Sequence, residues 1–114
     1  MSSLHQVNPN IAADYVEVGR WLQSFATSHA KRENDHVEVE VDTAGPRAGR
    51  SYGLRLHLAG RVAPPASAAP IELTFTEVAD GRTRFAWCAA LADRVRATTR
   101  ALLADASAGR RVSS

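Results

Sequence analysis

Residues 71–106, IELTFTEVADGRTRFAWCAALADRVRATTRALLADA, decide the fold that this sequence predicts. At the start of the stretch Ile71, Leu73 and Phe75 alternate with polar residues, which is the two-residue period of a half-buried strand. After Trp87 the apolar residues instead recur at helical spacing, and many alanines raise the helix propensity. The stretch therefore predicts a strand, a turn, a second strand and a long helix.

Side-chain parity places the turn of this predicted hairpin. A three-residue loop over residues 79–81 puts Phe85 and Trp87 on the same face as the apolar residues of the first strand, whereas a two-residue turn puts them on the opposite face. We therefore expect the three-residue loop, with a bulge at Gly81. In the alternative, the helix starts at Asp80, because the apolar residues that follow also fit a heptad.

Three further elements precede this stretch. An apolar stripe at helical spacing runs over residues 11–29, with Asn8 as the expected cap and Pro9 in the first turn. Residues 36–42, HVEVEVD, alternate strictly and predict a strand with its valines inward. Residues 52–58 predict a second strand, with one tyrosine and three leucines inward.

The outer faces of the predicted strands differ in charge. The first strand is acidic, the second is basic, the third carries Glu72 and the fourth carries Arg84. Pairing in sequence order sets Glu38 opposite Arg55 and Arg61 opposite Glu72, so that opposite charges meet. The sequence therefore predicts an α+β fold in the order α-β-β-β-β-α, with a four-stranded antiparallel meander of order 1-2-3-4 and both terminal helices packed on one face.

Length and composition suit one small domain. Among the 114 residues we expect a flexible N-terminus over 1–8, a single domain over 9–106 and a disordered C-terminal tail over 107–114. No run is long and apolar enough to span a membrane, and residues 1–6 lack the pattern of a signal peptide. With Cys88 as the only cysteine, no internal disulfide forms, so we expect a cytoplasmic protein. The excess of arginine and alanine is typical of a bacterial protein.

Arginines make one candidate site, for an anion or a nucleic acid. Arg47 and Arg50 lie in the loop 43–50, and Arg82 and Arg84 lie near the predicted hairpin turn. In a meander these two connections lie at the same end of the sheet, and arginine forks suit phosphate or carboxylate. The net charge of +2 is too small to indicate nucleic acid by itself, and a solvated surface is the simpler interpretation.

A histidine pair makes a second, weaker candidate. His36 and His57 would face each other across the first two strands, where they would bind a metal ion or act as a pH switch. A metal site needs three or four placed ligands, and the pattern supplies only Glu38 nearby. We therefore expect no metal and no cofactor, and we interpret Cys88 as a buried, unreactive thiol.

Aromatic residues make the third set of candidates. A pocket between the helices and the sheet would suit a small apolar ligand. Trp21 lies beside the apolar stripe of the first helix, so it is the candidate for an interface. The candidate pocket residues are Tyr15, Phe25, Tyr52, Phe75, Phe85 and Trp87.

No catalytic, metal-binding or nucleotide-binding motif stands out, so an enzyme is the least supported class. Open sheet edges and smooth alanine-rich helix surfaces favour association. The sequence therefore predicts a non-catalytic protein-interaction module that acts as a homodimer or binds another protein. The alternatives are a binder of a small apolar ligand and a binder of anions or nucleic acid. No membrane partner is expected.

Overall fold

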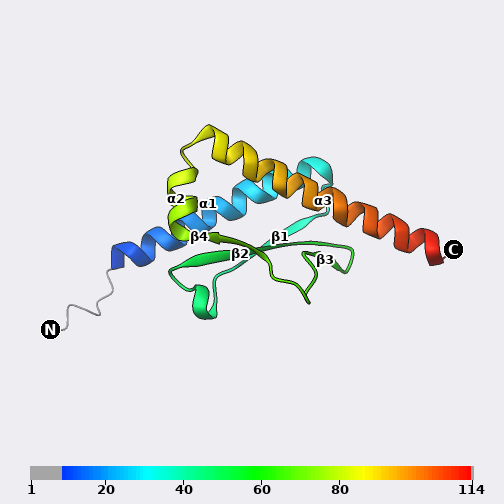
Figure 1. Ribbon diagram of the computed structural model, residues 1–114, viewed down its shortest axis with the longest axis horizontal. Helices are drawn as coiled ribbons and strands as arrows, with labels where there is room; N and C mark the ends of the chain where they lie inside the picture. The colour runs from blue at the N-terminus through cyan, green and yellow to red at the C-terminus, as the bar shows by residue number, and fades with distance from the viewer. Residues whose placement is uncertain (1–8, 114) are drawn as a thin grey trace.

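A computed structural model describes the backbone of residues 9–113 and the side chains of residues 13–105. Within these residues three α-helices and a four-stranded antiparallel sheet form an α+β fold, in the helix–sheet–helix order that the sequence predicts (Figure 1). The elements are α1 (Pro9–Glu33), β1 (Glu38–Asp42), the 3-10 turn η2 (Gly45–Arg47), β2 (Ser51–Leu58), β3 (Arg61–Ala63), β4 (Ile71–Thr74), α2 (Phe75–Gly81) and α3 (Phe85–Ser113).

The sheet is centred on β2. One side of β2 pairs with β1, and its other side pairs with β4 along residues 51–54 and with β3 along residues 56–58. The strands β3 and β4 therefore share one side of β2, which makes the sheet three strands wide. This path replaces the predicted 1-2-3-4 meander, because the chain supplies one more strand before residue 64 and one fewer after residue 75.

The register also differs from the predicted one. Glu40, and not Glu38, lies opposite Arg55, so β1 is shifted by two residues. Glu72 lies opposite Gly53, and Arg61 pairs with Leu58. A two-residue shift keeps every inward residue inward, so burial of the apolar face does not distinguish the two registers. The charge pattern on the exposed face was therefore too weak a guide.

The extra strand comes from a hairpin that the sequence analysis missed. Leu58 and Arg61 are paired, and the two residues between them form the turn. Both have positive φ angles, 53° for Ala59 and 80° for Gly60, as a type I′ turn requires. Alanine is unusual in this conformation, so an Ala-Gly pair is a weak sequence signal for a hairpin turn.

The predicted fourth strand is wrong, because residues 75–81 form α2 and α3 begins at Phe85. A capping box starts α2: the Thr74 hydroxyl accepts from the Glu77 N–H at 3.1 Å, and the Glu77 carboxylate accepts from the Thr74 N–H at 3.1 Å. This pattern is readable in the sequence. Gly81 ends α2 where the Trp87 ring leaves no room for a Cβ, so the glycine serves close packing and not a bulge.

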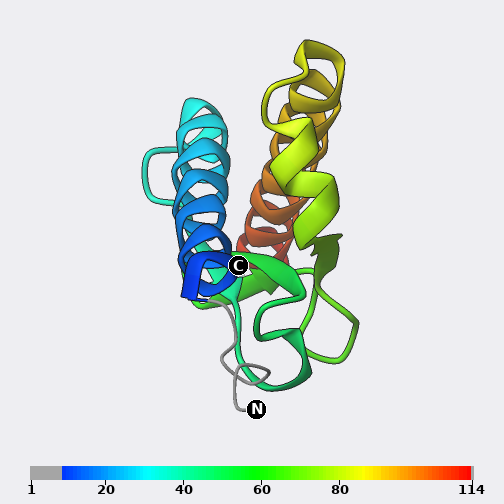
Figure 2. The same cartoon turned by 90° about the vertical axis from the view of Figure 1, so that its left-hand side faces the viewer.

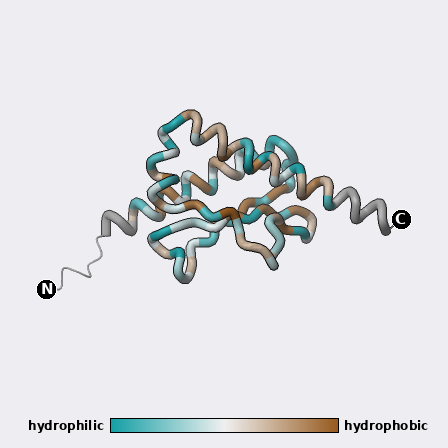
Figure 3. Tube along the Cα trace, in the orientation of Figure 1, coloured by the Kyte–Doolittle hydropathy of each residue, from teal (hydrophilic) through white to brown (hydrophobic). Residues whose placement is uncertain are grey.

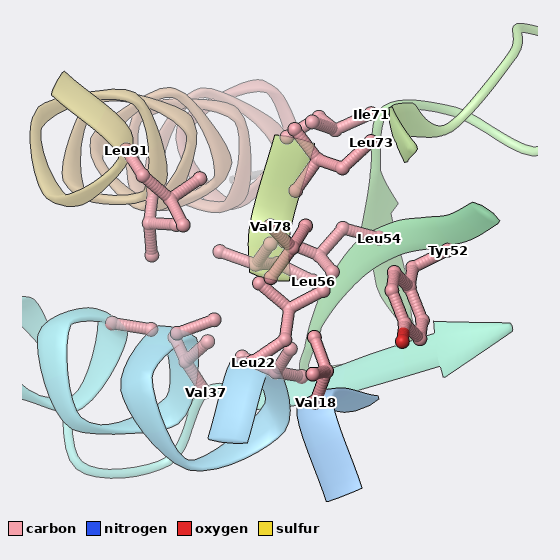
Figure 4. Close-up of a cluster of buried hydrophobic side chains, with 14 of the residues drawn as sticks. Val18, Leu22, Val37, Tyr52, Leu54, Leu56, Ile71, Leu73, Val78 and Leu91 are labelled. Atoms are coloured by element: carbon pink, nitrogen blue, oxygen red, sulfur yellow. The ribbon is translucent and has the colours of Figure 1, made fainter. Parts of the chain in front are cut away.

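Both long helices cover one face of the sheet, as predicted (Figure 2). The strands carry much of the strongest hydrophobic colour in Figure 3, next to the helices. Leu22 of α1, Leu54 and Leu56 of β2 and Val78 of α2 meet in the core, and each is fully buried (Figure 4). The predicted inward residues Val39, Leu54, Leu56 and Leu58 therefore form the core together with residues of all three helices, and Val41 packs against it half-buried.

The long helix α3 continues to Ser113. It passes Ala106, where the sequence places its end, so residues 107–113 of the expected tail belong to the helix. Residue 114, the N-terminal segment 1–8 and the Asn8 cap lie outside the described residues. Within residues 9–113, no helix is both long and apolar enough to cross a bilayer.

Candidate functional site

An open groove of about 410 Å³ runs between α1 and the outer edge of β1. One wall is a strip of α1, and the other is the end of β1 with the residue that follows it. Val16, one of the two exposed large hydrophobic residues of the described chain, lines this groove and is 50% exposed. The groove is lined by Tyr15, Val16, Gly19, Arg20, Gln23, Ser24, Val41 and Thr43.

The hydrogen-bond parity of the sheet shows which peptide groups of β1 face this groove. The Phe75 N–H donates to the Arg50 carbonyl at 2.8 Å. Even-numbered residues of β2 therefore direct their backbone N–H and C=O groups toward β4, and odd-numbered residues direct theirs toward β1. In the register of β1 with β2, residues 38, 40 and 42 then bond to β2. The N–H and C=O groups of Val39 and Val41 consequently point away from β2, toward the open edge.

Gln23 of α1 reaches this edge. Its side-chain amide donates to the Val39 carbonyl at 2.6 Å and lies 3.5 Å from the Thr27 hydroxyl. An exposed strand edge presents unpaired backbone groups that can template another strand, and native proteins often cover such edges. Gln23 therefore satisfies one of the four backbone groups that Val39 and Val41 turn outward, through a side-chain hydrogen bond and not through a further strand.

Tyr15, which lines the groove, stacks on the buried Tyr52. The Tyr15 and Tyr52 rings lie 4.7 Å apart and are nearly parallel. The Tyr15 hydroxyl lies 2.6 Å from the Ser51 carbonyl oxygen, and the Tyr52 hydroxyl donates to the Tyr15 carbonyl at 2.7 Å. Tyr52 also lies under Gly19, where a Cβ would come within 3.0 Å of the ring. These contacts hold α1 firmly over the sheet beside the groove.

The outer face of β1 is acidic. Glu38 and Glu40 are exposed, and Asp42 is half-buried. The His57 ring nitrogen Nε2 lies 2.8 Å from the Glu40 carboxylate, and the Arg47 guanidinium lies 3.0 Å from the Asp42 carboxylate. The edge strand therefore presents a row of carboxylates on the side of the sheet opposite the helices.

Arg47 attaches the loop that contains η2 to the sheet. Its guanidinium binds the Glu72 carboxylate at 2.8 Å and lies so close to Gly53 that there is no room for a Cβ. These bonds from Arg47, with one from Ser51, hold the pKa of Glu72 below its ordinary value. Arg47 is thus already paired with carboxylates, a use that suits its planar fork.

The structure does not bring the four arginine candidates together. Arg47 and Arg50 lie in the η2 loop on the outer side of the sheet, whereas Arg82 and Arg84 lie in the turn between α2 and α3 on the helix side (Figure 1). The expected convergence depended on a hairpin where α2 forms. Arg55 is likewise a structural residue, since its guanidinium donates to three carbonyl oxygens of the loop 64–68.

The six aromatic pocket candidates fall into three places. Tyr15, Tyr52 and Phe75 form one cluster, in which Phe75 lies 6.2 Å from Tyr15. Phe25 and Trp87 instead flank Trp21, the interface candidate, between α1 and α3. The remaining candidate, Phe85, is 87% exposed at the start of α3, because the helix replaces the strand that would have turned it inward.

A second side of α1 faces α3. Trp21 stacks on Phe25 at 4.8 Å, and Phe25 lies 4.6 Å from the His29 ring. One turn further on, the Glu33 carboxylate binds Arg96 at 2.9 Å and Arg100 at 3.3 Å. This side of α1 is therefore closed by aromatic packing and by ion pairs, in contrast to the side that borders the groove.

The histidine and cysteine candidates occupy separate surroundings. His57 lies opposite Glu38, and both line a shallow hollow with His36. Among the described residues, no three histidine, cysteine or acidic side chains gather as a metal site would need. Cys88 is half-buried in the first turn of α3, with its sulfur 3.6 Å from the carbonyl oxygens of Gly81 and Arg82.

Sequence reasoning missed the residues that form the groove, above all Val16, Gln23 and Val41. Val16 lies off the apolar stripe predicted for the first helix, and Val41, which the alternation predicts to be inward, is only half-buried. Recognising the groove requires knowing that β1 is an edge strand and that α1 runs beside it. Comparisons with models of known protein families, with curated proteins and with solved structures found no match.

Proposed function

We propose that this protein is a non-catalytic protein-interaction module that binds an extended segment of a partner protein along the outer edge of β1. The observation that carries this proposal is the groove, which Val41 lines, at a strand edge where Val39 and Val41 turn their backbone groups away from β2. An extended peptide adds to such an edge as a further strand: its main chain supplies affinity, and pockets for alternate side chains supply specificity.

The side-chain environment of the groove supports this mode of binding. Alternate side chains of an added strand would point toward the helices, where they meet Val16, Gly19 and Tyr15. Val16 is half exposed and would lose water contact on binding. Gly19 also lines the groove, and the Tyr52 ring occupies the place where its side chain would lie.

A homodimer, which the sequence predicts, would use the same β1 edge if two copies paired strand to strand. Two copies that pair through β1 would set acidic residues of one strand opposite acidic residues of the other, which weakens the pair. We therefore place another protein ahead of a second copy as partner. Dimerisation through the helix surfaces, the apolar-ligand pocket and the anion site stay predictions, and no contact described above favours one of them over the β1 edge.

The test is selection from a displayed library of random twelve-residue peptides on the immobilised protein. We expect selected peptides to lose binding at least tenfold with Val41→Pro, which removes an N–H that faces the open edge without removing a bond to β2. Val16→Asp should weaken binding similarly, because it places a charge in the apolar wall. Phe85→Asp is the matched control, since it changes the other exposed large hydrophobic residue, outside the groove.

Two results would contradict the proposal. One is a library that yields no peptide whose binding depends on Val16 or Val41. The other is equal sensitivity to Phe85→Asp, which would indicate general hydrophobic adhesion. Far-UV circular dichroism of each variant shows whether the fold is kept, so that loss of binding is not confused with unfolding. Light scattering after size exclusion then reports whether the protein alone is a monomer or a dimer.

A further inference from the structure

We infer that the segment bound along β1 alternates basic and apolar residues, with its lysine or arginine side chains on the face that carries Glu38 and Glu40. This inference rests on the proposed function, because it names the chemistry of the partner for the same edge. It follows from the charge of β1 and from the wall of the groove.

The first step is the row of carboxylates. A strand that pairs with β1 in register shares its pleat, so its outward side chains stand beside the outward side chains of β1. Those side chains are Glu38, Glu40 and Asp42. Arg47 binds Asp42, and the His57 ring contacts Glu40, whereas Glu38 is exposed. Basic side chains of a ligand would therefore meet Glu38 and Glu40.

The second step is the opposite face of the added strand. There the ligand meets Val16, Gly19 and Val41, which provide apolar contact. Arg20 also lines this side of the groove, so a cation placed there would meet a like charge. Basic residues are consequently favoured at alternate positions only, and apolar residues are favoured between them.

The third step concerns a second copy of this chain as the ligand. The outward residues of its own β1 are acidic, so every register that keeps the valines inward places carboxylate against carboxylate. The inward valines of the second copy suit the groove, but its outward residues carry the same negative charge as those of β1. The charge of the edge therefore selects a foreign basic segment over self-pairing.

Three synthetic peptides test the inference directly. Each has eight residues with valine at alternate positions, and the other positions carry arginine, threonine or glutamate; all carry the same polar solubilising tag. At low salt, fluorescence anisotropy should give the arginine peptide roughly tenfold tighter binding than the threonine peptide, and the glutamate peptide the weakest. The advantage should shrink in 1 M salt, where the screening length is about 3 Å.

Charge reversal on the protein localises the effect. Glu38→Lys should remove most of the preference for the arginine peptide and improve binding of the glutamate peptide, while binding of the threonine peptide stays within about twofold. Glu17→Lys makes the same change in net charge on an exposed position of α1 that does not line the groove. It should leave the order of the three peptides unchanged.

The outcomes separate this inference from the proposed function. If the arginine and threonine peptides bind equally well, and Val41→Pro abolishes the binding of both, the charge preference is wrong and strand addition is supported. Binding of none of the three, together with an empty peptide library, overturns both. If Glu17→Lys abolishes the preference for the arginine peptide as fully as Glu38→Lys does, the peptide is attracted by the overall charge of the protein. That result would overturn the assignment to β1. A dimer of the protein that Val41→Pro dissociates would show that a second copy occupies the edge, which overturns a foreign basic segment.

Discussion

The two flanks of α1 differ in what covers them. We define the closed flank as Trp21, Phe25, His29 and Glu33, which face α3, and the open flank as Val16, Gly19 and Gln23, which border the groove beside β1. The closed flank is filled by rings and ion pairs from α3. The open flank carries no aromatic ring and is bordered by a strand that lacks a neighbour on that side within residues 9–113.

This difference assigns stability to one side of the helix and the proposed binding to the other. Large rings on the closed flank exclude water and hold the two helices together in the arrangement of Figure 2. On the open flank, a hydrogen bond from Gln23 occupies the strand edge without filling the space. Changes on the closed flank should therefore reduce stability, whereas changes on the open flank should alter binding.

The largest expected effect is that of Phe25→Ala. Phe25 lies between Trp21 and His29 and is half-buried, so its loss should lower the free energy of unfolding by about 2–3 kcal/mol. Val16→Ala on the open flank should change it by less than about 0.5 kcal/mol. Urea unfolding followed by far-UV circular dichroism measures both. Equal losses would mean that the two flanks contribute alike to stability.

Gln23→Ala should have an intermediate effect with two parts. Losing the bond to the Val39 carbonyl should lower the free energy of unfolding by about 0.5–1.5 kcal/mol. The freed carbonyl should also bind the selected peptides more tightly, since Gln23 no longer competes for it. Titration of the same peptide against both proteins measures this gain. Weaker binding by the variant would show that Gln23 contacts the ligand and does not compete with it.

Glu33→Gln should make the protein less sensitive to acid. Hydrogen bonds from Arg96 and then Arg100 hold the pKa of Glu33 below its ordinary value of 4.5. The stabilisation from ionised Glu33 is therefore complete above pH 4.5 in the native protein and is lost as the pH falls through the lower, folded pKa. Thermal melts from pH 6 to pH 3 should show a shallower decline for the variant. Glu17→Gln, an exposed change on α1, should retain the full decline.

The smallest expected effect is that of His29→Phe on the pH dependence of stability between pH 7 and pH 5. Burial, and then Arg32 and Arg96, keep the pKa of His29 below its ordinary value of 6.5. His29 binds a proton near pH 6.5 in the unfolded chain but only at lower pH in the folded chain, so stability falls as the pH drops below 6.5. The variant should lose part of this fall, whereas a change of the exposed His36 to Gln should not. An unchanged slope would mean that His29 titrates normally in the fold.

The success of sequence reasoning varied along the chain for physical reasons. Alternation in residues 36–42 correctly predicted β1, and helical periodicity predicted α1 and α3. It failed at residues 75–85, where Phe75 and Phe85 suit a strand by propensity but the capping box at Thr74 starts a helix. A local hydrogen-bond motif there outweighed the preference of the aromatic residues for strands.

The candidate site depended on information that no local pattern holds. The arginines were expected to converge because the connectivity was taken as a meander, and the real path of β3 and β4 separates them. The groove is lined by Val16 of α1 and Val41 of β1, which are 25 residues apart in the chain. Neither residue alone distinguishes a groove from an ordinary surface.

The sequence by itself determined the α+β class, the periodicity of the first and last helices, and the acid-and-valine alternation that makes β1 both half-buried and acidic. These features depend on local periodicity, which a folded chain must respect to bury apolar surface. Only the tertiary structure decided that β1 lies at an edge, that Gln23 reaches the Val39 carbonyl, and that Arg47 is already bound by Asp42 and Glu72. Those contacts join segments distant in sequence, and they depend on strand order and register, which local preferences leave open.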